Sequence, residues 1–283
     1  MKTIAFLLPG LLLACIASPA ALACSPAALG TSRIMRISAP GGLAVGLKSY
    51  PQTLALADHE VVLTFDDGPS PKTTPAVLDA LAQDCVKATF FLIGRNAQAN
   101  SGLVKREIAE GHTVGHHTMT HPPLTLRSLA DAGARADIDS GFAADDIAAY
   151  GSSGPQPRVG FFRFPGFGDT KPLLAWLADR NIAVFGTDLW VSDWLDMTPE
   201  AELALVMRRL QAEGRGIILL HDIKPATAAM LPAFLAELKA KGFKIVHLAP
   251  GDGAPKLAAA PAGWTSETEK ILARMWPKVP VRP

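Results

Sequence analysis

The sequence has little net charge, few cysteines and no long uninterrupted apolar run. Its 283 residues include 27 Lys and Arg against 26 Asp and Glu, and no basic cluster interleaved with aromatic residues, so electrostatic binding of nucleic acid is not expected. No stretch reaches the roughly 20 consecutive apolar residues that a transmembrane helix needs, so we expect no stable membrane insertion. A G-x-S-x-G elbow is missing, which argues against a serine hydrolase of the α/β type.

The N-terminus has the pattern of an export signal. Lys2 precedes an apolar stretch from Ile4 to about Ala14, and small residues follow up to position 23. A charged start, an apolar centre and an A-x-A site are typical of a signal peptide, so we expect residues 1–23 to be cleaved and the protein to be periplasmic or secreted. Cys24 after the cut makes a lipoprotein an alternative, which Ala21 disfavours because lipoboxes usually carry Leu there.

Cleavage would leave two cysteines, Cys24 and Cys85. Exported proteins can oxidise such a pair, and a bridge would attach the N-terminal arm to the helix after the first central strand. Two unpaired thiols are the alternative, and the sequence leaves both open.

The order of elements indicates an α/β fold. Residues 24–58 are rich in Gly, Ala and Pro and indicate an extended arm with a short strand near Arg33–Ile37. Strands then alternate with helices, which implies a parallel sheet. The expected strands are Val61–Phe65, Ala88–Ile93, Thr113–Val114, Gly160–Arg163, Ile182–Phe185, Gly216–Leu220 and Phe243–Val246. The expected helices are Pro75–Gln83, Gly102–Glu110, Ser128–Tyr150, Pro172–Arg180, Pro199–Glu213, Thr227–Lys241 and Ser266–Met275.

Seven strands are one short of a full eight-fold barrel. We therefore predict a distorted (β/α)7-type barrel over residues 59–250, preceded by the arm at 24–58. A C-terminal extension over 251–283 is expected to pack on the barrel through Trp264 and Trp276.

Two adjacent carboxylates end the first central strand, in Thr64-Phe65-Asp66-Asp67-Gly68. Parallel α/β folds place their chemistry at the carboxyl ends of strands. Neighbouring carboxylates repel each other, so the pair needs positive charge beside it. The pair therefore predicts a functional site at this strand end.

Further ionisable residues follow other strands. His117 and His121 have a spacing that puts both imidazoles on one side of a helix or tight turn, as metal ligands require. Two imidazoles and one carboxylate form a three-ligand set that leaves a position open, as in catalytic zinc sites. Arg163, Asp193 and His221 also come at or after strand ends. An arginine in the apolar run at 160–164 needs an acidic partner.

These motifs resemble the polysaccharide deacetylases, the NodB-homology domain of carbohydrate esterase family 4, over about residues 60–247. The matching stretches, in the family's order, are Thr64–Gly68, His117–His121, Arg163–Pro165, Asp193-Trp194 and Leu219–His221. The family fold is a distorted (β/α) barrel, and its members are metal-dependent deacetylases.

The resemblance implies a role for each matched residue. Asp67, His117 and His121 would hold one divalent metal, most often Zn²⁺, with Co²⁺ or another transition metal as alternatives. Asp66 would be the general base and His221 the general acid, while Arg163 would orient Asp66 and Asp193 would tune His221. The implied substrate contacts are Pro165, Gly166, Trp194 and Leu219.

The resemblance implies an N-deacetylase of GlcNAc-containing glycans, of the chitooligosaccharide or peptidoglycan type, and we expect the protein to be a monomer. Two alternatives stay open: an O-acetyl xylan esterase on the same site and a non-catalytic glycan-binding relative. A two-metal phosphoesterase would need more ligands.

The sequence differs from the family pattern at three places, and these differences leave the preferred glycan in question. His116 stands where many members have Asn, and we expect it to point away from the metal. Gly166 replaces a common aromatic residue, with Phe164 or Phe167 as possible substitutes. The loop at 188–194 is long, which makes Asp188 and Trp190 candidates for substrate choice.

Overall fold

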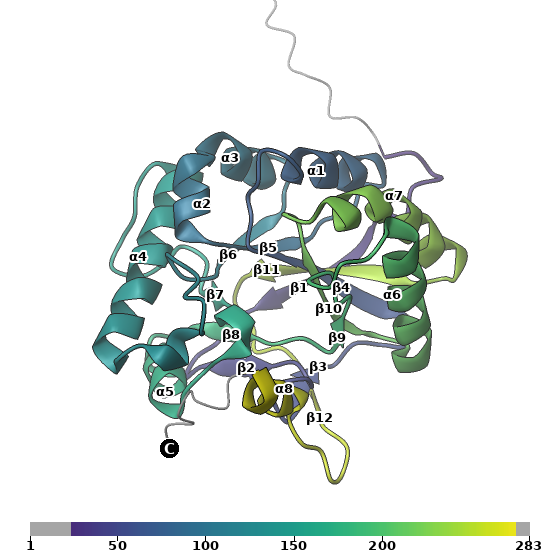
Figure 1. Ribbon diagram of the computed structural model, residues 1–283. Coiled ribbons are helices and arrows are strands. Elements are labelled where there is room, and N and C mark those ends of the chain that lie inside the picture. The colour runs from purple at the N-terminus through teal and green to yellow at the C-terminus, as the bar shows by residue number, and fades with distance from the viewer. Residues whose placement is uncertain (1–23, 276–283) are drawn as a thin grey trace, which may run out of the picture.

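A curved sheet forms the centre of the computed structural model, which describes residues 24–275 (Figure 1). All pairings within this sheet are parallel, and its strands run in the order β1-β11-β4-β5-β6-β7-β8-β2, with β10 between β4 and β9. Its strands are β1 (Thr31–Ile37), β2 (Leu43–Val45), β4 (Glu60–Asp66), β5 (Thr89–Leu92), β6 (Thr113–His116), β7 (Phe161–Phe162), β8 (Ala183–Phe185), β9 (Leu189–Trp190), β10 (Gly216–His221) and β11 (Lys244–Pro250). Among these residues no pairing joins β9 to β2 or β8, so the predicted α/β barrel is confirmed in an incompletely closed form.

Helices surround the sheet (Figure 1). They are α1 (Thr74–Gln83), α2 (Gly94–Ala99), α3 (Ser101–Ala109), α4 (Asp131–Tyr150), α5 (Lys171–Asp179), α6 (Pro199–Glu213), α7 (Pro225–Ala240) and α8 (Glu267–Met275). Each of the seven predicted helices is present, while the short α2 was not predicted. The start of α6 shows why its boundary was readable: the Thr198 hydroxyl accepts from the Ala201 N–H at 3.3 Å and Pro199 takes the first helical position.

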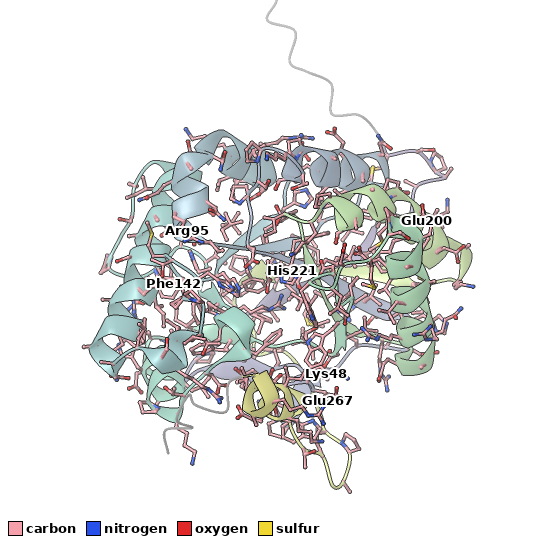
Figure 2. The ribbon with its side chains drawn as sticks, viewed as in Figure 1. Lys48, Arg95, Phe142, Glu200, His221 and Glu267 are labelled. Atoms are coloured by element: carbon pink, nitrogen blue, oxygen red, sulfur yellow. A yellow bond between two sulfur atoms is a disulfide. The ribbon has the colours of Figure 1, made fainter. Side chains whose placement is uncertain are left out.

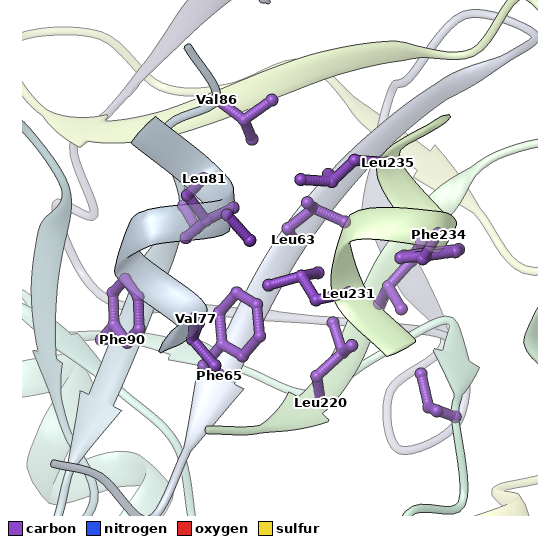
Figure 3. Packing of buried hydrophobic residues seen from close by; sticks show 14 of the residues in the cluster. Leu63, Phe65, Val77, Leu81, Val86, Phe90, Leu220, Leu231, Phe234 and Leu235 are labelled. Atoms are coloured by element: carbon purple, nitrogen blue, oxygen red, sulfur yellow. The ribbon is translucent and has the colours of Figure 1, made fainter. Parts of the chain in front are cut away.

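The largest core cluster lies between the sheet and helices α1 and α7 (Figure 3). Leu63, Phe65 and Leu220 from the sheet meet Leu231 and other residues of the two helices, and all four are fully buried. Burying a side chain of this size stabilises a fold by about 1.5–3 kcal/mol. The apolar run before the paired aspartates therefore anchors the strand that carries them.

Strand register aligns the polar residues at one edge of the sheet. His221 of β10 is paired with Asp66 of β4, and Leu92 of β5 is paired with His116 of β6. His116 is in turn paired with Phe162 of β7. Because all these strands are parallel, Asp67, His117 and Arg163 each leave the sheet one residue beyond an aligned position.

The N-terminal arm pairs at several places instead of forming a single edge strand. β1 lies beside β11, β2 lies beside β8, and β3 (Gln52–Leu54) forms an antiparallel pair with β12 (Leu257–Ala259). The Trp264 indole N–H donates to the Leu47 carbonyl at 2.7 Å. The predicted signal peptide and Trp276 lie outside the described residues, and within residues 24–275 no helix has the length and apolarity to cross a bilayer.

A disulfide joins Cys24 to Cys85, with 5.8 Å between their Cα atoms. The sequence left open a disulfide or two unpaired thiols, and the structure contains the disulfide. It attaches the start of the arm to the turn that follows α1, next to the bond from the Gly30 N–H to the Asp84 carbonyl at 2.8 Å.

We predict that replacing both Cys24 and Cys85 by Ser lowers the free energy of unfolding by about 2–4 kcal/mol, because a cross-link of this span restricts the unfolded chain. Urea unfolding of the oxidised protein, the reduced protein and the double variant measures the effect. The reduced protein should match the variant. Equal stability of all three, or peptide maps without a linked Cys24–Cys85 pair, would contradict the bridge.

Candidate metal and catalytic site

Three side chains from two strand ends converge on a small volume. The Oδ1 atom of Asp67 lies 3.5 Å from Nε2 of His117 and 3.5 Å from Nε2 of His121. One ligand atom from each of the three residues lies within 4.8 Å of the others. Ligand bonds of 2.0–2.2 Å at tetrahedral angles would place ligand atoms ~3.4 Å apart, so these separations suit a shared cation.

The hydrogen bonds of these residues also suit a metal. Asp67 Oδ1 is buried and has no hydrogen-bond partner among the described residues. His117 Nδ1 lies 2.7 Å from the Arg163 carbonyl oxygen, which can only accept. Nδ1 therefore carries the proton and Nε2 keeps its lone pair. Burial lowers the pKa of His117 to about 4, although Asp66 and Asp67 oppose this. At pH 7 the ring is therefore neutral, and its Nε2 lone pair is available to a metal.

Two of the three residues have left-handed backbones. Asp67 has φ of 76° and His121 has φ of 49°. Such conformations cost free energy for non-glycine residues and are concentrated at functional sites. The segment from His117 to His121 is an irregular turn, not a helix, in which the Thr118 hydroxyl accepts from the His121 N–H at 3.0 Å.

Gly68 is required by close packing. A Cβ atom at this position would lie 2.3 Å from Oδ2 of the buried Asp222. The glycine after the paired aspartates therefore allows the strand end to approach the turn after β10.

Asp66 is held by a buried arginine. Arg163 Nη1 donates to Asp66 Oδ1 at 2.7 Å and to the Thr64 hydroxyl at 2.8 Å. The Arg163 Nε and Nη2 groups donate to the carbonyls of Phe185 and Gly186 at 3.0 and 2.9 Å. Arg163 is fully buried, so its charge is compensated by Asp66 and fixed in one position. The acid partner that the sequence required for Arg163 is Asp66.

His221 is oriented by Asp193. His221 Nδ1 lies 2.7 Å from Asp193 Oδ1, and its backbone N–H donates to Asp193 Oδ2 at 2.7 Å. Burial favours the neutral ring, but the carboxylate of Asp193, with those of Asp67 and Asp66, outweighs burial and raises the pKa of His221 to about 9. His221 is therefore poised to donate a proton near neutrality.

A second acid supports Asp193. The Thr227 hydroxyl lies 2.9 Å from Asp193 Oδ2 and 2.8 Å from Glu202 Oε1. One hydroxyl proton can serve only one of these oxygens. Burial raises the pKa of Glu202 to about 7, so a protonated Glu202 can donate to Thr227, which then donates to Asp193.

A cavity of about 310 Å³ opens above these groups. Of the four predicted substrate contacts, Gly166, Trp194 and Leu219 line it, whereas Pro165 is buried and does not line it. Gly166 has φ of 55°, a conformation that favours glycine over the aromatic residue common in the family.

Aromatic side chains form one side of the cavity. Phe164 and Phe167, the suggested substitutes, both line it, as does Trp190. The Trp190 ring centroid lies 6.4 Å from that of Phe167 and 6.0 Å from that of Trp194. Asp188 does not line the cavity, because it accepts from the Ile217 and Leu47 N–H groups at 2.8 Å each and fixes the loop instead.

His116 points away from the cavity, as expected. Its Nε2 lies 3.1 Å from the Val159 carbonyl, and its Nδ1 lies 2.8 Å from Asp145 Oδ2. Burial lowers the pKa of His116 to about 3 and raises that of Asp145, so the two form a neutral pair. With both nitrogens engaged, His116 has none left for a metal.

Sequence reasoning missed several cavity residues. Lys224, three residues after His221, lines the cavity, and no acidic group of residues 24–275 lies within ion-pair distance of its ammonium. Thr268, Ile271 and Leu272 of α8 line the cavity as well. The periodicity of α8 was visible in the sequence, but nothing in it indicated which part of the barrel the helix would cover.

Comparison with known proteins agrees with this geometry. Residues 55–181 match the sequence profile described as "Polysaccharide deacetylase". A chitooligosaccharide deacetylase of Sinorhizobium fredii is 32% identical over 219 residues, which cover 77% of this chain and 84% of the relative. This chain belongs to the polysaccharide deacetylase family.

Other family members share less of their length with it. The peptidoglycan-N-acetylglucosamine deacetylase PgdA of Listeria monocytogenes is 34% identical over 69% of this chain, which spans only 39% of PgdA. The solved structure of the peptidoglycan deacetylase Bd3279 of Bdellovibrio bacteriovorus is 32% identical, with a TM-score of 0.67 over 78% of this chain and 59% of that one. The profile match ends at residue 181, so Asp193, His221 and α8 lie beyond it.

We predict that Asp67→Asn loses tight binding of a divalent metal, by about 10-fold or more, whereas Asp66→Asn retains it. Asp67 offers a ligand atom to a metal, while Asp66 is bound by Arg163. Metal content after dialysis against a competing chelator, together with Zn²⁺ titration calorimetry, measures both variants. Equal loss from the two variants would show that Asp66 is itself a ligand.

We also predict that His221 titrates near pH 9 in the metal-free protein and that Asp193→Asn lowers its pKa by more than ~1 unit. The raised pKa means that the ring is charged below about pH 9 and neutral above it. NMR titration of the imidazole resonances measures the shift. An unchanged pKa in the variant would remove Asp193 from this role, and Asp139→Asn on the exposed side of α4 is the control.

Proposed function

We propose that this chain is a metal-dependent hydrolase that removes N-acetyl groups from GlcNAc-containing glycans. The observation that carries the proposal is the arrangement of Asp67, His117 and His121 between a carboxylate fixed by arginine and an imidazole fixed by a carboxylate. Family membership supports the reaction class. The names of relatives acting on peptidoglycan and chitooligosaccharide support the substrate class.

Two imidazoles and a carboxylate suit Zn²⁺, with Co²⁺ as an alternative. When bound at Asp67, His117 and His121, such a cation would polarise the acetyl carbonyl and increase the acidity of water. Chelation should therefore abolish activity.

The protein side chains divide the proton transfers between them. Asp66 accepts the proton of the attacking water, since Arg163 occupies its Oδ1 and fixes the carboxylate, while Oδ2 lies 3.9 Å from Nε2 of His117. His221 carries a proton to the departing amine, because Asp193 favours its charged form. A positioned acid and a positioned base each contribute about 10²–10⁴-fold.

The cavity residues position the acetyl group. Leu219 and Trp194 supply apolar surface for the methyl group, and the backbone N–H of Gly166 is available for the developing oxyanion. The aromatic side formed by Phe167, Trp190 and Trp194 provides faces on which a sugar ring can stack. We further propose export through the signal peptide at residues 1–23, which places the enzyme where cell-wall or extracellular glycans occur.

We predict acetate release from N-acetylated chitooligosaccharides or from peptidoglycan, lost on chelation and restored by Zn²⁺ or Co²⁺. Asp66→Asn should lower kcat by about 10² or more while metal content is unchanged. An enzymatic acetate assay on chitooligosaccharides, peptidoglycan and acetylated xylan, run with and without chelator, measures this.

Each alternative has its own result in this assay. Release from xylan alone would indicate an O-acetyl esterase, and glycan binding without release from any substrate would indicate a non-catalytic relative. Near-normal turnover by Asp66→Asn would exclude Asp66 as the base. Lys270→Ala, on the exposed side of α8, is the control.

A further inference from the structure

The C-terminal helix α8 forms part of the wall of the candidate active site. Thr268, Ile271 and Leu272 line the same cavity as Asp66, Asp67 and His221. In Figure 1 this helix lies against the region of β2 and β3, and in Figure 2 Glu267 at its start lies beside Lys48 of the N-terminal arm. The helix is outside residues 55–181, so the family match assigns it no role.

One arginine connects α8 to the loops that carry the site. Arg127 lies in the loop after His121 and forms a two-pronged ion pair with Glu269, in which Nη1 donates to Oε2 at 3.0 Å. Arg127 Nε also donates to the carbonyl of Asp169, just after Phe167, at 2.6 Å. The guanidinium thus joins three segments that border the cavity.

The opposite side of α8 is attached to the N-terminal arm. Lys48 Nζ donates to Glu267 at 2.7 Å, and the Thr268 hydroxyl donates to the Lys48 carbonyl at 3.0 Å. The Thr268 backbone N–H donates to the same carbonyl at 3.0 Å. Because contacts on two sides hold the helix, α8 is a fixed wall in this structure.

The surface that α8 presents to the cavity is mainly apolar. Leu272 is 6% exposed and Ile271 is half-buried. Neither side chain can replace the hydrogen bonds that sugar hydroxyls would lose on leaving water. A polar glycan chain continuing past this wall would therefore be disfavoured both by bulk and by desolvation.

We propose that α8 closes one end of the substrate cleft and that Ile271 limits how far a glycan extends on that side. This inference rests on the proposed deacetylase function and adds a preference for short oligosaccharides or chain ends over the interior of a polymer. The size of the side chain at position 271 then determines the selectivity for glycan length, and Ile271 takes no part in proton transfer.

The experiment compares kcat/KM for acetate release from N-acetylated chitobiose and chitohexaose. Ile271→Ala should raise the hexamer-to-dimer ratio by about 5-fold or more, since a single methylene group in an apolar pocket can change selectivity by about 10–200-fold. Ile271→Phe should lower the ratio. Glu269→Gln, which weakens the attachment to Arg127, should raise it, and Lys270→Ala should leave it unchanged.

The outcomes separate the inference from the proposed function. An unchanged ratio in Ile271→Ala and Glu269→Gln, with active enzyme and unaltered melting temperature, overturns the role of α8. A rise in KM for both substrates alike overturns it too, because α8 would then be a binding surface and not a barrier. Absence of acetate release from both substrates by the unaltered, Zn²⁺-loaded protein is the failure of the proposed function itself.

Discussion

Two adjacent carboxylates at the end of one buried strand are the constraint on which the site depends. Two carboxylates side by side repel each other, so Asp66 and Asp67 each need positive charge nearby. The structure separates the two demands: Arg163 compensates Asp66 from within the sheet, whereas Asp67 faces His117 and His121, with which it could hold a cation. Because Asp67 Oδ1 has no hydrogen-bond donor among the described residues, the remaining charge there is available for a cation.

The parallel sheet makes this separation possible. Residues that follow aligned positions in neighbouring strands reach the same edge, which is why Arg163 and His117, 46 residues apart in sequence, share a hydrogen bond. That bond also fixes the tautomer of His117, so the residue that compensates the proposed base also prepares a proposed metal ligand. His221, the proposed proton donor, is paired in register with Asp66 and so lies on the other side of the same strand.

The strand ends of this fold could be predicted from the sequence because apolar runs stop abruptly at charged residues. Val61–Phe65 before Asp66 is such a case, and so is Gly216–Leu220 before His221. Short elements without this contrast were missed: β9 has two residues and pairs through the backbone, and α2 begins without a side-chain cap. The orientation of His116 was expected, but its partner Asp145 could not be, since Asp145 lies 29 positions later in the sequence, on α4.

The arm and the C-terminal helix show the limit of motif reasoning most clearly. The motifs contain the residues for which we propose roles in the reaction, and these come from strand ends whose position the sheet determines. Residues that border the rest of the glycan come from segments attached by ion pairs such as Arg127 with Glu269 and Lys48 with Glu267. No periodicity in the sequence indicates which Lys or Arg an exposed Glu will meet. The chemistry of the site is therefore readable from the order of motifs, whereas the shape of the cleft depends on contacts between segments more than a hundred residues apart.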